Sequence, residues 1–403
     1  MKKSEEKIKE KRRKKESVFL VTGATGFLGS HITFELLREG YKVITVCRAH
    51  KDLSASERMG LLMDWYPVES SLRNNLTIIE GSLDDTNLGL DNNTYQTIAQ
   101  NIDEVVHCAS NTSFSERNRK AVEKANNDNL KNIIYLVENS GCYYFHHLST
   151  AYVAGKIDDF CPEEFQIAHN FFNVYEETKY LQEKYLLREC SRSGVRLNIY
   201  RPTIVYGNSE TGKTLRFNAL YYPIKTLLFL KQLYEKDLKD NHGEKAKALG
   251  VQCEEGNNIY LPIRLETCEK GTLNLIPVDF FLKAWMTLME SEISGNIFHI
   301  ANSYPTRLDE VIEYTRILFG ISGINKADRN DFDHIPKNAL EILFDSYIDV
   351  YRPYIKDTRV FNTDKSDAIL NRHNIYCPRF SFEIFEKCMK YAISVMWQTP
   401  AHG

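Results

Sequence analysis

The sequence predicts an α/β fold, with a doubly wound parallel sheet and a smaller, mainly helical part toward the C-terminus. Two observations support this prediction. Short apolar runs of the kind that fill buried parallel strands alternate along the chain with longer helical stretches. A glycine-rich turn joins the first apolar run to the first helix, at the edge where open α/β sheets bind their ligands.

The first strand, turn and helix form the clearest part of this pattern. Val18–Thr22 fits a buried strand, and the turn Gly-Ala-Thr-Gly-Phe-Leu-Gly at 23–29 follows it directly. An amphipathic helix then runs to about Arg38, and a second strand is predicted at Lys42–Cys47. Glycines at such a turn let the backbone approach a pyrophosphate, whose charge meets the helix N-terminus. This order of elements predicts a dinucleotide site.

The later elements continue the alternation. Further strands are predicted at about 76–80, 104–108, 143–148, 196–200, 275–278 and 297–300, and helices at about 116–139, 175–192 and 279–290. Strands that alternate with helices imply a parallel sheet with right-handed crossovers. We therefore assign residues 18–207 and about 273–302 to a nucleotide-binding domain, and about 208–272 and 303–403 to a substrate-binding region that caps the cleft.

Residues 1–17 differ from the rest in charge, because they hold nine Lys or Arg and four Glu in a chain of net charge −3. Such a basic run predicts a disordered tail or a frayed helix, and contact with nucleic acid or anionic lipid is the less favoured alternative. No apolar signal segment follows, and no stretch reaches the roughly 18 apolar residues of a membrane span, so we expect a cytoplasmic protein. The nine cysteines lack metal-ligand spacing, which predicts reduced thiols and no metal site.

Hydroxyl, phenol and ammonium groups are predicted at the same sheet edge. Ser149 and Thr150 follow the strand at 143–148, and Tyr175 and Lys179 lie four residues apart on the next helix. A tyrosine has a pKa of about 10 and becomes a useful acid at neutral pH when a nearby cation stabilises its phenolate. Tyrosine and lysine at this spacing also occur on ordinary helices, and strand-end hydroxyls often cap loops. Their convergence beside the glycine turn favours a proton-donating site.

The residue that closes the second strand bears on the choice of dinucleotide. An acid at this position binds the free 2′-hydroxyl of NADH, whereas a base accepts the 2′-phosphate of NADPH. Arg48 stands there, and no acid precedes Asp52. An arginine at a strand end is also a common surface residue, but the absence of an acid favours NADP(H).

Five motifs in order along residues 18–300 resemble those of the extended short-chain dehydrogenases/reductases, a family with a Rossmann sheet. They are Thr22-Gly-Ala-Thr-Gly-Phe-Leu-Gly29, His107-Cys-Ala-Ser, Leu148-Ser-Thr-Ala-Tyr-Val, Tyr175-Glu-Glu-Thr-Lys179 and Arg201-Pro-Thr-Ile-Val-Tyr-Gly207. The resemblance implies an NAD(P)-dependent oxidoreductase. It also implies Thr150 as the catalytic hydroxyl, with Ser149 as the alternative, Tyr175 as the acid, and Lys179 as a lysine that also holds the nicotinamide ribose.

The resemblance further implies where the cofactor lies. By their positions in the family motifs, the contacts would come from Gly23, Thr25, Gly26, Phe27, Leu28, Gly29, Arg48, Ser82, Leu83, Ala109, Ser110, Asn111, Tyr175, Lys179, Pro202, Thr203 and Val205. The family's structural asparagine maps onto Asn126, although the residues around it depart from the usual pattern. Ser82 departs as well, because the family normally has an aspartate there that contacts adenine.

Two substrate classes compete within this superfamily, namely nucleotide sugars and acyl thioesters. The runs Gly207-Asn-Ser-Glu-Thr-Gly212, Leu273-Asn-Leu-Ile-Pro-Val-Asp279 and Cys47-Arg-Ala resemble those of the thioester reductase and fatty acyl-CoA reductase (male-sterility-type) family, whose enzymes act in lipid metabolism. The resemblance implies reduction of an acyl-CoA or carrier-protein thioester to an aldehyde, with a further step to an alcohol left open. Alternatives are a nucleotide-sugar epimerase or dehydratase, a ketone or aldehyde reductase, and a non-catalytic dinucleotide sensor.

The segment 215–233 is too apolar around its circumference for a helix with one wet face. It fits the lining of an acyl channel or a peripheral contact with a membrane, and it fits a buried core helix equally well. Residues 234–258 are charged and irregular, which predicts a loop near the channel entrance. The oligomeric state and the acyl chain are not encoded in any feature of the sequence.

Overall fold

A seven-stranded parallel sheet forms the centre of the protein in the computed structural model, which describes residues 5–157, 159–291 and 296–398. Its strands lie in the order β13 (Ile297–Ile300), β7 (Arg196–Pro202), β5 (Tyr144–Leu148), β4 (Glu104–His107), β1 (Val18–Thr22), β2 (Lys42–Cys47) and β3 (Leu76–Glu80). Each neighbouring pair is parallel. The strand order reverses beside β1, which places the ligand cleft at the carboxyl ends of β1 and β4.

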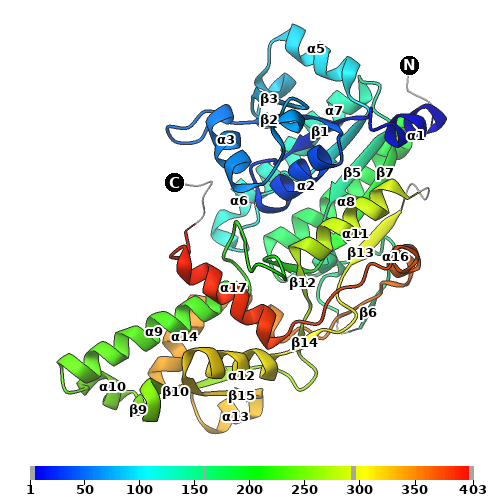
Figure 1. Ribbon diagram of the computed structural model, residues 1–403. Coiled ribbons are helices and arrows are strands. Elements are labelled where there is room, and N and C mark those ends of the chain that lie inside the picture. The colour runs from blue at the N-terminus through cyan, green and yellow to red at the C-terminus, as the bar shows by residue number, and fades with distance from the viewer. Residues whose placement is uncertain (1–4, 158, 292–295, 399–403) are drawn as a thin grey trace.

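Helices cover both faces of this sheet (Figure 1). One apolar core packs α2 (Phe27–Arg38), α3 (Ala55–Trp65) and α11 (Val278–Glu290) on one face. A second core packs α5 (Asn92–Asn101), α7 (Asn129–Glu138) and α8 (Val174–Ser193) on the other. The two central strands β4 and β5 are buried along their whole length, as expected for a sheet covered on both faces. The predicted α/β fold with a doubly wound parallel sheet is confirmed.

A second, smaller unit follows and contains a sheet that the sequence analysis did not anticipate. Its strands are β15 (Ile321–Ala327), β10 (Asn258–Glu266) and β9 (Gln252–Glu254). Pro262 lies within β10 and argues against a strand, but the register shifts between Tyr260 and Ile263. This irregularity accommodates the proline, which has no backbone N–H to donate.

Helices surround this small sheet. They include α9 (Tyr221–Asp240), α10 (Glu244–Ala248), α12 (Leu308–Phe319), α14 (Ala339–Ile348) and α17 (Phe382–Ser394). The apolar segment expected at 215–233 is therefore helical only from residue 221, and most of the charged stretch expected to be irregular at 234–258 is helix or strand. The charged side chains of this stretch do not prevent helix formation, because α9 still buries Ile224, Leu230 and Tyr234 in one apolar core with the small sheet and its other helices.

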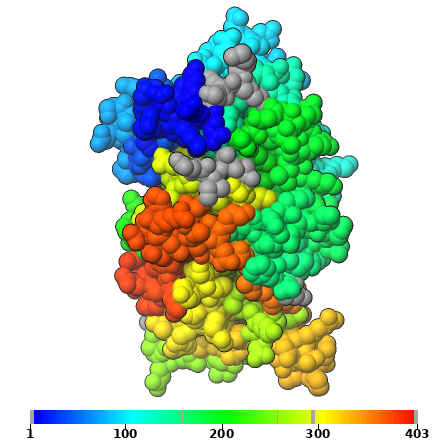
Figure 2. Space-filling model, turned by 90° about the vertical axis from the view of Figure 1, so that its right-hand side faces the viewer, coloured from blue at the N-terminus to red at the C-terminus, as the bar shows by residue number. Residues whose placement is uncertain are grey.

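The C-terminal segment returns to the nucleotide-binding part. Strand β16 (Val360–Phe361) pairs with β6 (Phe160–Cys161), and α16 (Asp364–Leu370) places Ile369 and Leu370 in the core of the large sheet. Figure 2 shows this orange-to-red segment lying between the N-terminal part of the chain and the substrate-binding region. The two parts are therefore joined by chain that crosses between them several times.

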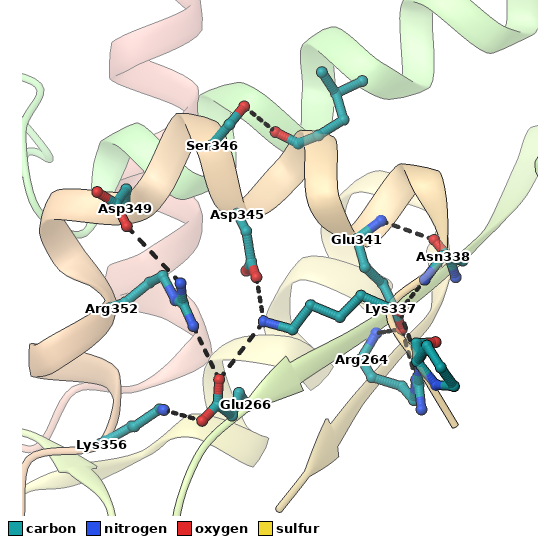
Figure 3. A network of polar contacts seen from close by, with 12 residues as sticks. Arg264, Glu266, Lys337, Asn338, Glu341, Asp345, Ser346, Asp349, Arg352 and Lys356 are labelled. Atoms are coloured by element: carbon teal, nitrogen blue, oxygen red, sulfur yellow. Dashed lines mark hydrogen bonds and ion pairs between the residues drawn. The ribbon is translucent and has the colours of Figure 1, made fainter. Parts of the chain in front are cut away.

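Ion pairs hold α14 and the short helix α15 (Arg352–Ile355) on the small sheet (Figure 3). Arg264 of β10 donates through Nε to Glu341 of α14 at 2.7 Å. Glu266 of the same strand accepts from Arg352 at 2.9 Å and from Lys356. These contacts fix one wall of the substrate-binding region on its sheet.

The N-terminal basic segment differs from the disordered tail or frayed helix that its charge predicts. Residues 5–13 form α1 (Glu5–Arg13), which packs at the amino ends of the central strands β4 and β5, while residues 1–4 lie outside the described chain. Ile8 is fully buried, and Lys11 donates to Asp103 at 2.9 Å. Arg12 pairs with the buried Glu104 of β4. Lys11 and Arg12 of the basic run therefore make structural contacts and are not part of a solvated tail.

Candidate active site

The glycine turn after β1 forms a cradle that side chains would fill. Gly23 has a φ of +72°, and a Cβ there would lie 2.6 Å from the backbone nitrogen of Ala109. A Cβ at Gly29 would lie 2.1 Å from the carbonyl oxygen of Gly23. Helix α2 begins just after Gly26 without a side-chain cap, so its first N–H groups are available to an anion. This cradle fits the diphosphate of a dinucleotide.

Two adjacent hydroxyls at the end of β5 differ in what they contact. The Ser149 hydroxyl donates to the buried Glu183 at 2.5 Å, and Glu183 is also bound by Arg201. Thr150 makes long contacts with the backbone, at 3.5 Å to the carbonyl oxygen of Pro202 and 3.4 Å from the amide of Tyr152, and its side chain hydrogen-bonds with Tyr175. Ser149 is therefore committed to a structural network, whereas Thr150 remains available to a ligand.

Helix α8 carries the phenol and the ammonium. It begins after Asn173, whose side chain accepts from the amide of Glu176 at 3.0 Å, and this cap fixes the first turn that presents Tyr175. The Lys179 amine donates to the carbonyl oxygen of Leu148 at 2.8 Å. Tyr175 and Lys179 thus lie beside the end of β5, next to Thr150, as the sequence predicts.

The electrostatics of this pair differ from the expectation that Lys179 lowers the pKa of Tyr175. Burial raises the pKa of Tyr175, the neighbouring Glu176 adds to this effect, and a hydrogen bond with Thr150 opposes it. Burial lowers the pKa of Lys179 to about 8, against the opposing influence of Cys108 and Glu183. Without a ligand, the phenol therefore keeps its proton at neutral pH, and the lysine loses its proton at a lower pH than an ordinary lysine does.

Asn126 connects the strand-end loop to α8. It lies in a one-turn π-helix, Lys124–Asp128, and is fully buried. Its side chain accepts from the backbone of Asn111 at 2.7 Å and donates to Thr178 of α8 at 2.9 Å, while Gln182 donates to its backbone carbonyl. A π-turn of this kind often marks a functional site. Here it holds the helix that carries Tyr175 and Lys179 in register with the loop after β4.

A cavity of about 520 Å³ joins the glycine turn to the small unit. Residues expected to bind cofactor or substrate that line it are Gly26, Phe27, Leu28, Gly29, Ser110, Thr150, Tyr175, Lys179, Pro202, Thr203 and Val205. Its remaining wall is largely aliphatic and aromatic, with Leu227 from α9, Val311 from α12 and Phe344 from α14. The segment at 215–233 therefore lines the cavity and also forms part of the core. Gly23, Thr25, Arg48, Ser82, Leu83, Ala109 and Asn111 lie outside the lining of this cavity.

Arg58 was missed in the sequence although it lies at the dinucleotide end of the site. It is a buried residue of α3, and its guanidinium donates to the Thr25 hydroxyl at 3.0 Å and to the Arg48 carbonyl at 2.7 Å. No carboxylate pairs with it in the described parts of the chain. Burial lowers the pKa of Arg58, so the site holds a desolvated cation without a counter-charge. Arg48 itself is exposed beside it. A basic side chain in the helix that follows Arg48 was the available sequence signal.

Metal-ligating groups, disulfides and membrane-spanning helices were also examined in the structure described. No group of three or more metal-ligating side chains occurs among the residues described, and no disulfide joins any of the nine cysteines, all of which lie in the described chain. No helix within the described ranges is long and apolar enough to cross a membrane.

The sheet order, the glycine turn and the group formed by Thr150, Tyr175 and Lys179 define an extended short-chain dehydrogenase/reductase. Residues 21–285 match the model of the family described as male sterility protein, an NAD-binding family. Because the match covers most of the chain, the protein belongs to this family.

Relatives and solved structures agree with this assignment. The chain is 24% identical to the hybrid PKS-NRPS synthetase pvhA of Talaromyces variabilis over 47% of its own length, and it spans 4% of that protein. The terminal R domain of the myxalamid PKS-NRPS pathway has the same fold, with a TM-score of 0.70, 20% identity and coverage of 95% of this chain and 92% of that one. An archaeal thiolation-reductase di-domain gives a TM-score of 0.69 at 17% identity, over 94% and 76% of the two chains.

Proposed function

We propose that the protein is an NADPH-dependent reductase of acyl thioesters. The observation that carries this proposal is the cavity, which joins a dinucleotide cradle, a proton-donating group and an apolar chamber. A dinucleotide fits the glycine turn, and a linear acyl chain fits the chamber, because pockets for such ligands are largely apolar with a few convergent polar groups. A solved neighbour is named a thiolation-reductase di-domain of a non-ribosomal peptide synthetase, which supports a carrier-bound thioester as substrate.

The chemistry assigns a role to each side chain of the site. The bound cofactor would supply a hydride to the thioester carbonyl carbon. Tyr175 and Thr150 would donate hydrogen bonds to the developing oxyanion, and Tyr175 would then transfer its proton to that oxygen. With cofactor and substrate bound, the positive charge of Lys179 would stabilise the phenolate left on Tyr175, although burial keeps this phenol protonated in the unliganded site. Loss of the thiol from the resulting hemithioacetal gives an aldehyde.

The proposal also covers the carrier of the acyl group and the setting of the reaction. Both CoA and a carrier protein present a thioester on pantetheine, and either would extend from the cavity. We place the enzyme in the cytoplasm, where cysteines that form no disulfide stay reduced. Exposed apolar side chains on α9 and α14, Phe229 and Tyr347 among them, would serve a peripheral membrane contact.

The direct test combines purified protein with NADPH and a panel of acyl-CoA and carrier-bound thioesters of different chain length. We expect cofactor oxidation together with release of free thiol and aldehyde, and the product analysis also shows whether an alcohol forms. Turnover of nucleotide sugars, with an oxidised cofactor retained on the protein, would instead support an epimerase or dehydratase. Cofactor binding without turnover of any substrate would support a dinucleotide sensor.

A first prediction concerns the preference for NADPH. Arg58, together with the exposed Arg48, would bind the 2′-phosphate, since Arg58 is buried without a carboxylate partner in the described chain. Arg58→Ala is expected to lower kcat/KM for NADPH by about 10- to 100-fold, the value of a hydrogen bond to a charged group. The value for NADH should change little. Equal losses with both cofactors would contradict the assignment, and Arg38→Ala, at an exposed ion pair on α2, is the control.

A second prediction concerns pH. Activity is expected to fall as the pH rises through about 8, the pKa to which burial lowers Lys179. Above this pH the site loses its positive charge, whereas Tyr175 keeps its proton because burial raises its pKa. Measuring kcat/KM from about pH 6 to about pH 10 spans this range. Lys179→Arg should move the falling limb to higher pH, because arginine stays charged. A wild-type profile that is flat across the range would refute this assignment.

A further inference from the structure

Arg216 lines the cavity, and no carboxylate of the described chain pairs with its positive charge. It lies on the loop between β8 (Ile204–Tyr206) and α9, is partly buried, and contributes to the cavity lining. Its guanidinium has no carboxylate or hydrogen-bond partner among residues 5–157, 159–291 and 296–398, and burial lowers its pKa. Removing a charge from water is costly unless a partner compensates, so a cation in this setting indicates a ligand.

The other buried arginines show what a structural role looks like in this protein. Three of them have carboxylate partners, namely Arg12 with Glu104, Arg201 with Glu183, and Arg359 with Asp357. The cations of the network in Figure 3 are likewise paired with carboxylates. The buried cations that lack a carboxylate in the described chain are Arg58, which contacts Thr25 of the glycine turn, and Lys179, which lines the cavity. Arg216 shares this property and lines the same cavity as Lys179.

The loop that carries Arg216 is held by specific contacts. Ser209 donates through its amide and its hydroxyl to Asp279 at 2.8 and 2.7 Å. Gly212 has a φ of +70° and packs so closely on α17 that a Cβ there would lie 2.2 Å from the carbonyl oxygen of Lys387. The Thr214 hydroxyl accepts from the amide of Arg216 at 3.2 Å and donates to its carbonyl at 3.0 Å. The motif at 207–212 and Thr214 therefore fix the backbone of Arg216.

Backbone strain lies three residues further on. Ala219 has a φ of +42°, in the left-handed region that favours glycine, and its backbone hydrogen-bonds with Tyr351, which also lines the cavity. Strain of this kind persists where the surrounding structure enforces it, and it gathers at ligand sites. The side chain of Arg216 is thus presented from a backbone that is fixed on both sides.

We propose that Arg216 binds a phosphate group of a ligand in the cavity. A guanidinium suits this task because its planar fork binds phosphate through two parallel hydrogen bonds. Two sources supply the same chemistry: the diphosphate of the cofactor, whose cradle at Gly26, Phe27 and Leu28 lines the same cavity, and the phosphate of a pantetheine thiol carrier. The second source rests on the proposed function, whereas the first rests only on dinucleotide binding.

Equilibrium binding tests the proposal without requiring turnover. The protein of residues 1–403 and its Arg216→Gln variant are titrated calorimetrically with 4′-phosphopantetheine, with pantetheine, which lacks the phosphate, and with NADPH. If the thiol carrier is the source, the variant loses about 10- to 100-fold in affinity for phosphopantetheine, while pantetheine and NADPH bind as before. If the cofactor is the source, the loss appears with NADPH alone. Unchanged affinity for both phosphate ligands in a folded variant overturns the proposal.

Two further variants control the experiment. Arg316→Gln removes a guanidinium from the exposed face of α12, where it pairs with Glu313, and should alter none of the three affinities. Arg216→Lys keeps the charge and loses the fork, so it should show a smaller loss, and it replaces Arg216→Gln if that variant does not fold. Wild-type protein that binds phosphopantetheine through Arg216 yet reduces no acyl thioester would refute the proposed function and leave the phosphate site standing.

Discussion

Replacing Tyr175 by phenylalanine is expected to lower kcat by about 10²- to 10⁴-fold, the usual contribution of a positioned general acid. The substitution removes the hydroxyl that hydrogen-bonds with Thr150. It keeps the aromatic ring, whose centroid lies 5.6 Å from the ring centroid of Phe114. Cofactor affinity and stability should therefore stay close to wild type. Burial raises the pKa of Tyr175, which keeps the phenol protonated at neutral pH and makes the loss of a proton donor the expected cause.

Steady-state kinetics with an acyl thioester, together with equilibrium binding of NADPH, would check this result. Tyr185→Phe is the matched control, because Tyr185 lies on the same helix and does not line the cavity. Its kcat should equal that of the wild type. A Tyr175→Phe enzyme with more than about half of the wild-type rate would exclude the phenol as the acid, since a general acid contributes at least about 10²-fold.

The parts of the fold that sequence could predict are those with strong local patterns. The strand Val18–Thr22, the glycine turn and the helix from Phe27 were recognisable because buried parallel strands are continuous apolar runs. The helix predicted at about 279–290 corresponds to α11 (Val278–Glu290). The β10 strand was missed because Pro262 interrupts it, and only the tertiary structure shows that the strand absorbs the proline as an irregularity.

Some residues of the candidate site could likewise be predicted from the sequence, and others could not. Thr150, Tyr175 and Lys179 were predictable because they stand at fixed positions relative to a strand end and a helix start. The difference between Ser149 and Thr150 was not predictable, because it depends on Glu183, which is more than thirty residues away. The lack of a carboxylate partner at Arg58 and Arg216 could not be predicted either, because it is a property of the three-dimensional surroundings in the described chain.

The basic N-terminal segment was misread for a related reason. A run of lysines and arginines predicts solvation, and nothing in the local sequence distinguishes Arg12 from Arg13. In the structure Arg13 is exposed, whereas Arg12 is buried over the ring of Tyr144 and binds both Glu104 and the carbonyl oxygen of Met289. The difference arises from the helical phase of α1 as it docks on the sheet, which also buries Ile8.

The Glu104 carboxylate is fully buried in the sheet and depends on this docking. Although burial alone would raise its pKa, the Arg12 guanidinium, helped by His146, lowers the pKa of Glu104 to about 2. His146 contacts the carboxylate at 3.0 Å and Tyr200 on its other side at 3.0 Å. The depressed pKa contributes stability that is fully present above the ordinary value of 4.5 and is lost as the pH falls toward 2.

Arg12→Ala is therefore expected to lower the free energy of unfolding by about 3 to 5 kcal/mol, because it leaves a buried carboxylate without its partner. Arg13→Ala, one residue away and exposed, should change it by less than about 0.5 kcal/mol. Denaturant unfolding at neutral pH measures both values. Adding Glu104→Gln to Arg12→Ala should recover part of the loss, since it removes the unpaired charge. Equal stability of the Arg12 and Arg13 variants would mean that α1 is dispensable for the fold.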